Sequence, residues 1–265
     1  MGDINIVELV LLAIVTFIFA IDQFSLTELI YRPMIACPII GLILGDPTTG
    51  LAIGGTYELM MVGNMPIGGA QPPNAVLGGI VAMVFAVKAN MDINTALGAC
   101  MIFATFGQYV VTLVFTATSA LMAKADKAAE EANPKGITAC LNIHMGGLGA
   151  LFTIIAIVAY VGGTAAAGPL NDFKENATWF MAGLGAAGAM MRFVGFSILM
   201  KIMMAADMWG WLLAGFAMAL LFGNVAATAS AALILVAFIG IAIALLDFRI
   251  NSLAKNAEGG MSDGI

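Results

Sequence analysis

Two long stretches of the chain, residues 136–171 and 208–246, contain no Asp, Glu, Lys or Arg. A helix needs about 20 apolar residues to cross the hydrocarbon core of a bilayer, so the second stretch is long enough for nearly two crossings. Charged residues make up 10% of the whole chain, against about 25% in an average soluble domain. These features exclude a water-soluble globular protein and predict an all-α integral membrane protein.

Breaks rich in Gly and Pro interrupt the apolar stretches. Residues 45–48 (Gly-Asp-Pro-Thr) end one apolar run, and residues 63–74 hold three prolines, which a continuous helix does not tolerate. Residues 223–224 (Gly-Asn) divide the second uncharged stretch. Short, interrupted apolar segments are typical of transporters, in which irregular backbone is buried in protein or lines a cavity. We therefore expect a polytopic membrane protein with broken transmembrane helices and a re-entrant Pro/Gly-rich elbow that follows a helix over residues 48–62.

The pattern of charge and hydropathy predicts one integral membrane transport domain over residues 1–265. Its expected parts are an N-terminal half with the candidate site (5–122), a charged segment (123–136), a C-terminal helical half (137–248) and a polar tail (249–265). Because Lys and Arg near the ends of spans favour the cytoplasmic side, the charged segment and the tail are both expected there. That placement requires an even number of crossings between them.

Composition also limits the partners and the chemistry. A net charge of -6 leaves no basic surface for a nucleic-acid backbone. The cysteines, Cys37, Cys100 and Cys140, occur singly in apolar stretches, and their spacing indicates neither a disulfide framework nor a zinc site. His144 has no neighbouring acid or nucleophile in the sequence, and the chain has no P-loop motif. We therefore expect no cofactor, no metal and no catalytic residues.

Ionisable side chains inside apolar stretches are costly and are candidate functional residues. Glu58 is the clearest case, because it lies in the middle of the apolar run over residues 48–62 and follows Gly-Gly-Thr-Tyr. Thr56 supplies a hydroxyl close to it, and the elbow supplies amides, among them Asn64. Carboxylate, hydroxyl and amide groups are what a sugar site uses to bind ligand hydroxyls. The alternative is that Glu58 only forms an internal ion pair with Arg32 or Lys88.

Four motifs occur in order, at residues 32–38 (RPMIACP), 41–50 (GLILGDPTTG), 54–59 (GGTYEL) and 68–74 (GGAQPPN). Together they resemble the enzyme IIC subunit of the mannose family of bacterial phosphotransferase systems. The resemblance is strong over the first 90 residues and looser through the charged segment to the C-terminus. The motifs are specific because all four occur together at the family's spacing.

The elbow departs from the pattern of the mannose members. Those members generally carry Ala-Pro-Asp-Ala, whereas this chain has Gln-Pro-Pro-Asn at residues 71–74. The elbow and the terminal Asp263-Gly264-Ile265 look like the branch that handles galactosamine and N-acetylgalactosamine. Because a neutral Asn replaces an Asp, any charge-dependent role of that Asp is not carried over.

The resemblance implies a sugar-translocating subunit of the bacterial inner membrane, not an enzyme, that moves a hexose or amino sugar by an elevator-like displacement of a core against an arm. It implies a second membrane subunit (IID), cytoplasmic IIA and IIB proteins that phosphorylate the sugar, and trimers of IIC–IID pairs in the lipid bilayer. The positions that match the family's motifs assign sugar binding to Asp22, Thr56, Glu58, Gln71 and Asn74.

Other functions are compatible with the same residues. The chain could play the same IIC role for mannose, sorbose or fructose. A secondary transporter that cycles a proton on Glu58 would also need a carboxylate in a broken helix. It would require an ion gradient and would release unmodified sugar. A membrane scaffold or receptor would need neither the elbow amides nor Glu58.

Overall fold

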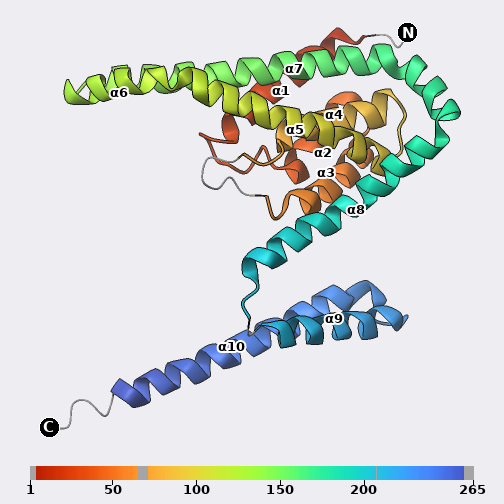
Figure 1. Cartoon of the computed structure of the whole chain (residues 1–265), viewed down its shortest axis with the longest axis vertical. Coiled ribbons are helices and arrows are strands. Elements are labelled where there is room, and N and C mark those ends of the chain that lie inside the picture. The colour runs from red at the N-terminus through yellow and green to blue at the C-terminus, as the bar shows by residue number, and fades with distance from the viewer. Residues whose placement is uncertain (1–3, 65–70, 207, 260–265) are drawn as a thin grey trace. The chain divides into compact units, whose positions relative to one another are not determined.

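The computed structural model describes residues 4–64, 71–206 and 208–259, and the regular secondary structure within this part is helical. The chain divides into two compact units, Met1–Ile202 and Met203–Ile265. Helices of the first unit, coloured red to cyan in Figure 1, are α1 (Ile6–Asp22), α2 (Pro33–Leu44), α3 (Pro47–Met61), α4 (Ala75–Lys88), α5 (Ile93–Thr118), α6 (Ala120–Glu130), α7 (Pro134–Asn176) and α8 (Thr178–Met203).

Four described helices are long and apolar enough to cross a membrane, over Ile93–Thr118, Pro134–Ala165, Thr178–Met203 and Ala229–Leu253. Three further apolar helices, α2, α4 and α9, are shorter. These elements confirm the predicted all-α membrane fold. The charged segment, residues 123–136, covers most of α6, the turn that follows it and the first residues of α7.

α2 and α3 form a hairpin whose tight packing depends on small residues. Gly45 ends α2 with a φ of 87°, a left-handed conformation that glycine adopts without strain. Asp46 then caps α3 by accepting a hydrogen bond from the backbone N–H of Thr49 at 3.0 Å. A Cβ added at Gly41 would lie 3.0 Å from the Cα of Gly50, so any larger residue would force the two helices apart. The motif over residues 41–50 therefore allows α2 and α3 to pack closely together.

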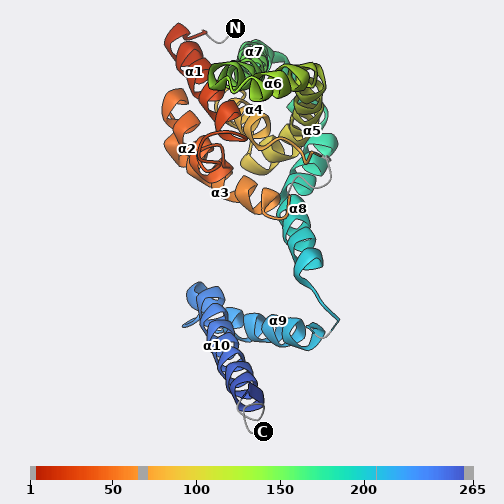
Figure 2. The same ribbon diagram turned by 90° about the vertical axis from the view of Figure 1, so that its left-hand side faces the viewer.

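α4 is the centre of the first unit. It contacts α1, α2, α3, α5 and α7 (Figure 2), and its residues from Ala75 to Val84 are all buried. A helix that is apolar on every face is suited to such an enclosed position. Its first turn follows the elbow, of which residues 65–70 lie outside the described part of the chain. The elbow thus connects the end of α3 to the most buried helix of the unit.

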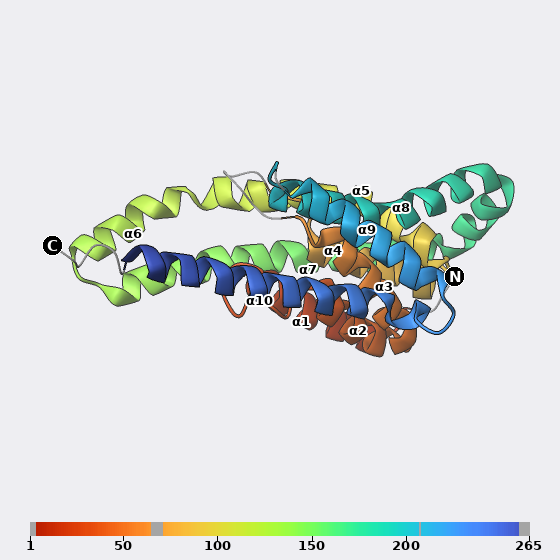
Figure 3. The ribbon, with the colours of Figure 1, turned by 90° about the horizontal axis from the view of Figure 1, so that it is seen from below.

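The second unit consists of α9 (Trp209–Asn224), a 3₁₀ turn (Ala229–Ala231) and α10 (Ala232–Gly259), and the two α-helices pack against each other (Figure 3). The predicted break at residues 223–224 is confirmed, because α9 ends at Asn224. The next helix begins at Ala232 because the hydroxyl of Thr228 donates to the carbonyl of Phe222 at 2.8 Å and holds a turn there.

α10 continues into the part of the chain that was expected to form a polar tail. Asn251 donates to the carboxylate of Asp247 at 3.1 Å, an i,i+4 contact that supports a helix. The helix ends at Gly259, and residues 260–265 lie outside the described part. Apolar side chains on both helices of the second unit are exposed, including Trp209, Leu233 and Phe238. Such surfaces require lipid or another membrane protein to cover them.

Candidate sugar-binding site

A cavity of about 230 Å³ lies at the C-terminal end of α1 in the first unit. The loop between α1 and α2, the end of α3 and the last residues of the elbow contribute to its wall. Its polar and aromatic lining residues are Gln23, Phe24, Glu28, Tyr31, Arg32, Asn64 and Gln71. Amide groups with aromatic rings are the usual lining of a site for a small polyhydroxylated ligand, which needs donors, acceptors and a flat apolar surface.

Asp22 is not part of the cavity wall, but it holds the loop between α1 and α2 that contributes to the wall. Its side chain is fully buried, and one carboxylate oxygen accepts from the backbone N–H of Thr27 at 2.8 Å and from its hydroxyl at 2.7 Å. The other oxygen accepts from the backbone N–H of Tyr31 at 2.9 Å. These three bonds hold the loop between α1 and α2 in one shape. Asp22, predicted from sequence to bind sugar, therefore contacts Tyr31, which lines the cavity, and Thr27, which does not.

Asn74 contacts a residue of the cavity wall, Gln23. Its side-chain carbonyl caps α4 by accepting from the backbone N–H of Leu77 at 3.0 Å, and its amide donates to Oε1 of Gln23 at 2.9 Å. Gln23 lines the cavity, and this bond fixes the orientation of its amide, whose NH₂ group remains as a donor. Asn74 is buried, and its hydrogen bond holds Gln23 in position. Sequence reasoning missed Gln23. The only sign of Gln23 in the sequence is that its amide directly follows Asp22.

Glu58 is connected to the cavity through Arg32. One carboxylate oxygen forms an ion pair with the guanidinium of Arg32, which lines the cavity. The other oxygen accepts from the backbone N–H of Met34 at 3.3 Å. The Arg32 side chain is 34% exposed and that of Glu58 is 18% exposed. Two internal partners were considered for Glu58, Arg32 and Lys88. In the structure Glu58 pairs with Arg32.

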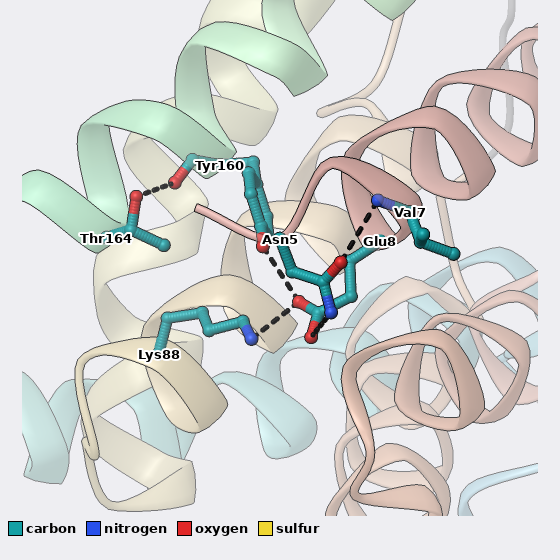
Figure 4. A network of polar contacts seen from close by, with 6 residues as sticks. All are labelled: Asn5, Val7, Glu8, Lys88, Tyr160 and Thr164. Atoms are coloured by element: carbon teal, nitrogen blue, oxygen red, sulfur yellow. Dashed lines mark hydrogen bonds and ion pairs between the residues drawn. The ribbon is translucent and has the colours of Figure 1, made fainter. Parts of the chain in front are cut away.

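Lys88 has a different partner. Its ammonium lies 2.5 Å from a carboxylate oxygen of Glu8, which also accepts from the hydroxyl of Tyr160 at 2.8 Å. Asn5 donates to the other oxygen of Glu8 at 3.2 Å (Figure 4). The side chains come from α1, α4, α7 and the residue that caps α1. This network fastens those three helices to one another.

The other two predicted residues differ in their relation to the cavity. Gln71 lines it directly. The hydroxyl of Thr56 donates to the carbonyl of Ala52 within α3 at 2.8 Å, and Thr56 is not part of the cavity wall. The structure therefore brings Gln71 into the cavity and places Asp22, Glu58 and Asn74 one side chain away from it. Their contact with sugar stays a prediction.

No group of three or more His, Cys, Asp or Glu side chains in the described residues could hold a metal ion. His144 pairs through Nδ1 with the hydroxyl of Thr118 at 2.8 Å and packs edge-on against the ring of Phe115. The surroundings of this ring are those of a structural histidine in a helix contact.

Several relatives are similar over most of the chain. The N-acetylgalactosamine permease IIC component 1 of Escherichia coli K12 is 33% identical over 217 residues, which are 82% of this chain and 80% of that protein. The mannose-specific EIIC component of the same strain is 32% identical over 81% of this chain and 80% of its own. The sorbose-specific EIIC component of Lacticaseibacillus casei is 34% identical over 65% of this chain and 62% of its own.

Two solved structures have the same fold. One, described as a membrane protein, has a TM-score of 0.82 and 28% identity and covers 93% of this chain and 97% of its own. The other is the mannose transporter ManYZ in a complex with microcin E492, with a TM-score of 0.59, 28% identity and coverage of 93% and 96%. The family model of the sorbose-specific IIC component of phosphotransferase systems matches residues 6–246. The chain therefore belongs to this family of inner-membrane IIC components, the mannose family of phosphotransferase sugar transporters.

Proposed function

We propose that this chain is the translocating IIC subunit for an amino sugar, galactosamine or N-acetylgalactosamine, which a IIB partner phosphorylates during uptake. The observation that carries the proposal is the cavity lined by amides and aromatic rings in a chain of the IIC family. One of the similar relatives is named for N-acetylgalactosamine, and others are named for mannose and sorbose.

The lining of the cavity offers each kind of contact that a hexose needs. Gln23, Asn64 and Gln71 present amides that can donate to and accept from sugar hydroxyls. The rings of Phe24 and Tyr31 supply a surface for the apolar face of the sugar ring. These groups come from a loop, a helix end and the elbow, so a change in their relative positions would open or close the cavity.

A IID membrane subunit is part of the proposal. In the candidate membrane helix Thr178–Met203, 11% of the most apolar part is buried within the chain, and in Ala229–Leu253 6% is buried. Such exposed helices have room for contacts with a second membrane subunit and with lipid. The similarity to the ManYZ mannose transporter also favours a partner of this kind. Assembly into trimers of IIC–IID pairs and an elevator-like movement rest on the family resemblance.

In this proposal IIA and IIB perform the phosphoryl transfer, and the chain binds and moves the sugar. The test is reconstitution of the chain with IID in proteoliposomes, with phosphorylated IIB outside and labelled N-acetylgalactosamine or galactosamine as substrate. We expect labelled sugar phosphate to form only when phosphorylated IIB and both membrane subunits are present. Accumulation of free sugar under a proton gradient without IIB would instead identify a proton-coupled transporter.

A further inference from the structure

Glu28 has an unusual backbone conformation at the edge of the candidate sugar site. Its φ is 55°, in the left-handed region that favours glycine, and the residue lines the cavity. Residues with a Cβ keep such a conformation only when their surroundings impose it, and they cluster at ligand sites. The bonds from Asp22 to Thr27 and Tyr31 hold the loop on both sides of Glu28. The structure thus fixes the backbone of Glu28 at the cavity, and the exposed carboxylate extends from that backbone.

The charge of Glu28 is not balanced within the described residues. The structure contains no hydrogen bond or ion pair from the described chain to its side chain, and the residue is exposed. Arg32 is the only cation among the described lining residues, and Glu58 already forms an ion pair with it. The cavity wall therefore carries an excess negative charge at Glu28. A ligand that carries a positive charge would be attracted to this position.

We propose that Glu28 is the specificity-determining residue that binds the ammonium group of an unacetylated hexosamine such as galactosamine. This inference rests on the proposed function, because it requires a sugar in this cavity. Gln23, Asn64 and Gln71 can bond the hydroxyls of neutral and amino sugars alike. A sugar hydroxyl can also donate to this carboxylate, but only a protonated amine carries a positive charge and adds the attraction of an ion pair. Acetylation removes that charge, so N-acetylgalactosamine would bind without this ion pair.

The test compares D-galactosamine with D-galactose, which differ only in the amine at carbon 2, on the chain purified with its IID partner in nanodiscs. At a pH that keeps the amine protonated, we expect the wild type to bind galactosamine about 10- to 150-fold more tightly. Glu28→Gln should abolish this preference, so that the variant binds galactosamine no more tightly than galactose. Glu28→Asn should do the same, because Asn tolerates the left-handed conformation and relieves the strain.

Glu130→Gln is the matched control, since Glu130 is an exposed acid on α6 outside the cavity. It should leave both affinities unchanged. Equal wild-type affinities for the two sugars, or a preference that survives both Glu28 variants, would overturn the inference and leave the transport function standing. An equal loss of affinity for both sugars in the Glu28 variants would also overturn the inference, because Glu28 would then only maintain the shape of the loop. A wild-type complex that binds neither sugar would overturn the inference, and one that also fails to bind N-acetylgalactosamine would overturn the proposed function as well.

Discussion

The guanidinium of Arg32 is ion-paired with the carboxylate of Glu58, which joins the residue that caps α2 to the last turn of α3. The pair accounts for the carboxylate that the sequence places in an apolar helix. It also holds Arg32 in the cavity wall, so Glu58 acts on the cavity through a neighbouring side chain. A charge in this position has a structural role and also sets the electrostatics of the site.

Glu58→Gln should lower both the stability of the protein and its affinity for sugar. The substitution leaves Arg32 without its anion, and we expect a cost of about 1–2 kcal/mol, less than the 3–5 kcal/mol of a fully buried pair because both side chains are partly exposed. Thermal unfolding of the IIC–IID complex measures this effect. The double variant Arg32→Gln with Glu58→Gln should recover part of the stability. Unchanged stability with lost affinity would show that Glu58 contacts the sugar directly.

Two substitutions of Asn74 separate its two contacts. Asn74→Ala removes the cap of α4, at a cost of about 1 kcal/mol, and releases Gln23. Asn74→Asp keeps an acceptor for the N–H of Leu77 and loses the donor to Gln23. We expect both variants to bind sugar more weakly, and only Asn74→Ala to be less stable. Sugar titration and thermal unfolding of the complex distinguish the two effects. Wild-type affinity in a folded Asn74→Asp protein would rule out a positioning role for Asn74.

The breaks between helices could be predicted from sequence because local chemistry determines them. Gly45 ends α2 through its left-handed backbone, Asp46 starts α3 as a cap, and residues 223–224 mark the end of α9. The start of the next helix could not be predicted in this way, because a turn held by Thr228 comes before α10 begins at Ala232. Residue preferences gave no sign of that bond, which joins a threonine hydroxyl to the carbonyl six residues earlier.

The candidate site could be predicted only in part. Glu58 and Asp22 could be identified because each is a charged residue in an apolar stretch. Such a residue is costly in a membrane whatever the tertiary fold. The contact between Gln23 and Asn74 joins residues 51 positions apart in the sequence, and only the packing of α1 against α4 brings them together. For the same reason the sequence left two possible partners for Glu58, and the fold selected Arg32.

The network around Glu8 should contribute strongly to stability (Figure 4). The side chains of Lys88 and Glu8 are 20% and 17% exposed, so Lys88→Met leaves a largely buried carboxylate without its cation. We expect this variant to lose about 3 kcal/mol of stability, near the lower end for breaking a buried pair. Tyr160→Phe removes a single hydrogen bond to Glu8 and should cost about 1–2 kcal/mol.

Thermal unfolding of the purified complex measures both variants. Glu8→Gln combined with Lys88→Met removes both charges and should be more stable than Lys88→Met alone. A double variant as unstable as Lys88→Met would indicate that the lost packing of the long Lys side chain, rather than the unpaired charge, causes the effect.

The charged segment and the C-terminal end of α10 should face the cytoplasm together. Lys124, Lys127 and Lys135 lie in or beside α6, and Arg249 lies in α10, so both regions carry the positive residues that favour the cytoplasmic side. Single cysteines at positions 127 and 257, in a background without the three native cysteines, should resist an impermeant thiol reagent in intact cells and react after permeabilisation. A cysteine at either position that reacts in intact cells would place that region outside. Labelling of only one of the two would require an odd number of crossings between α6 and the end of α10.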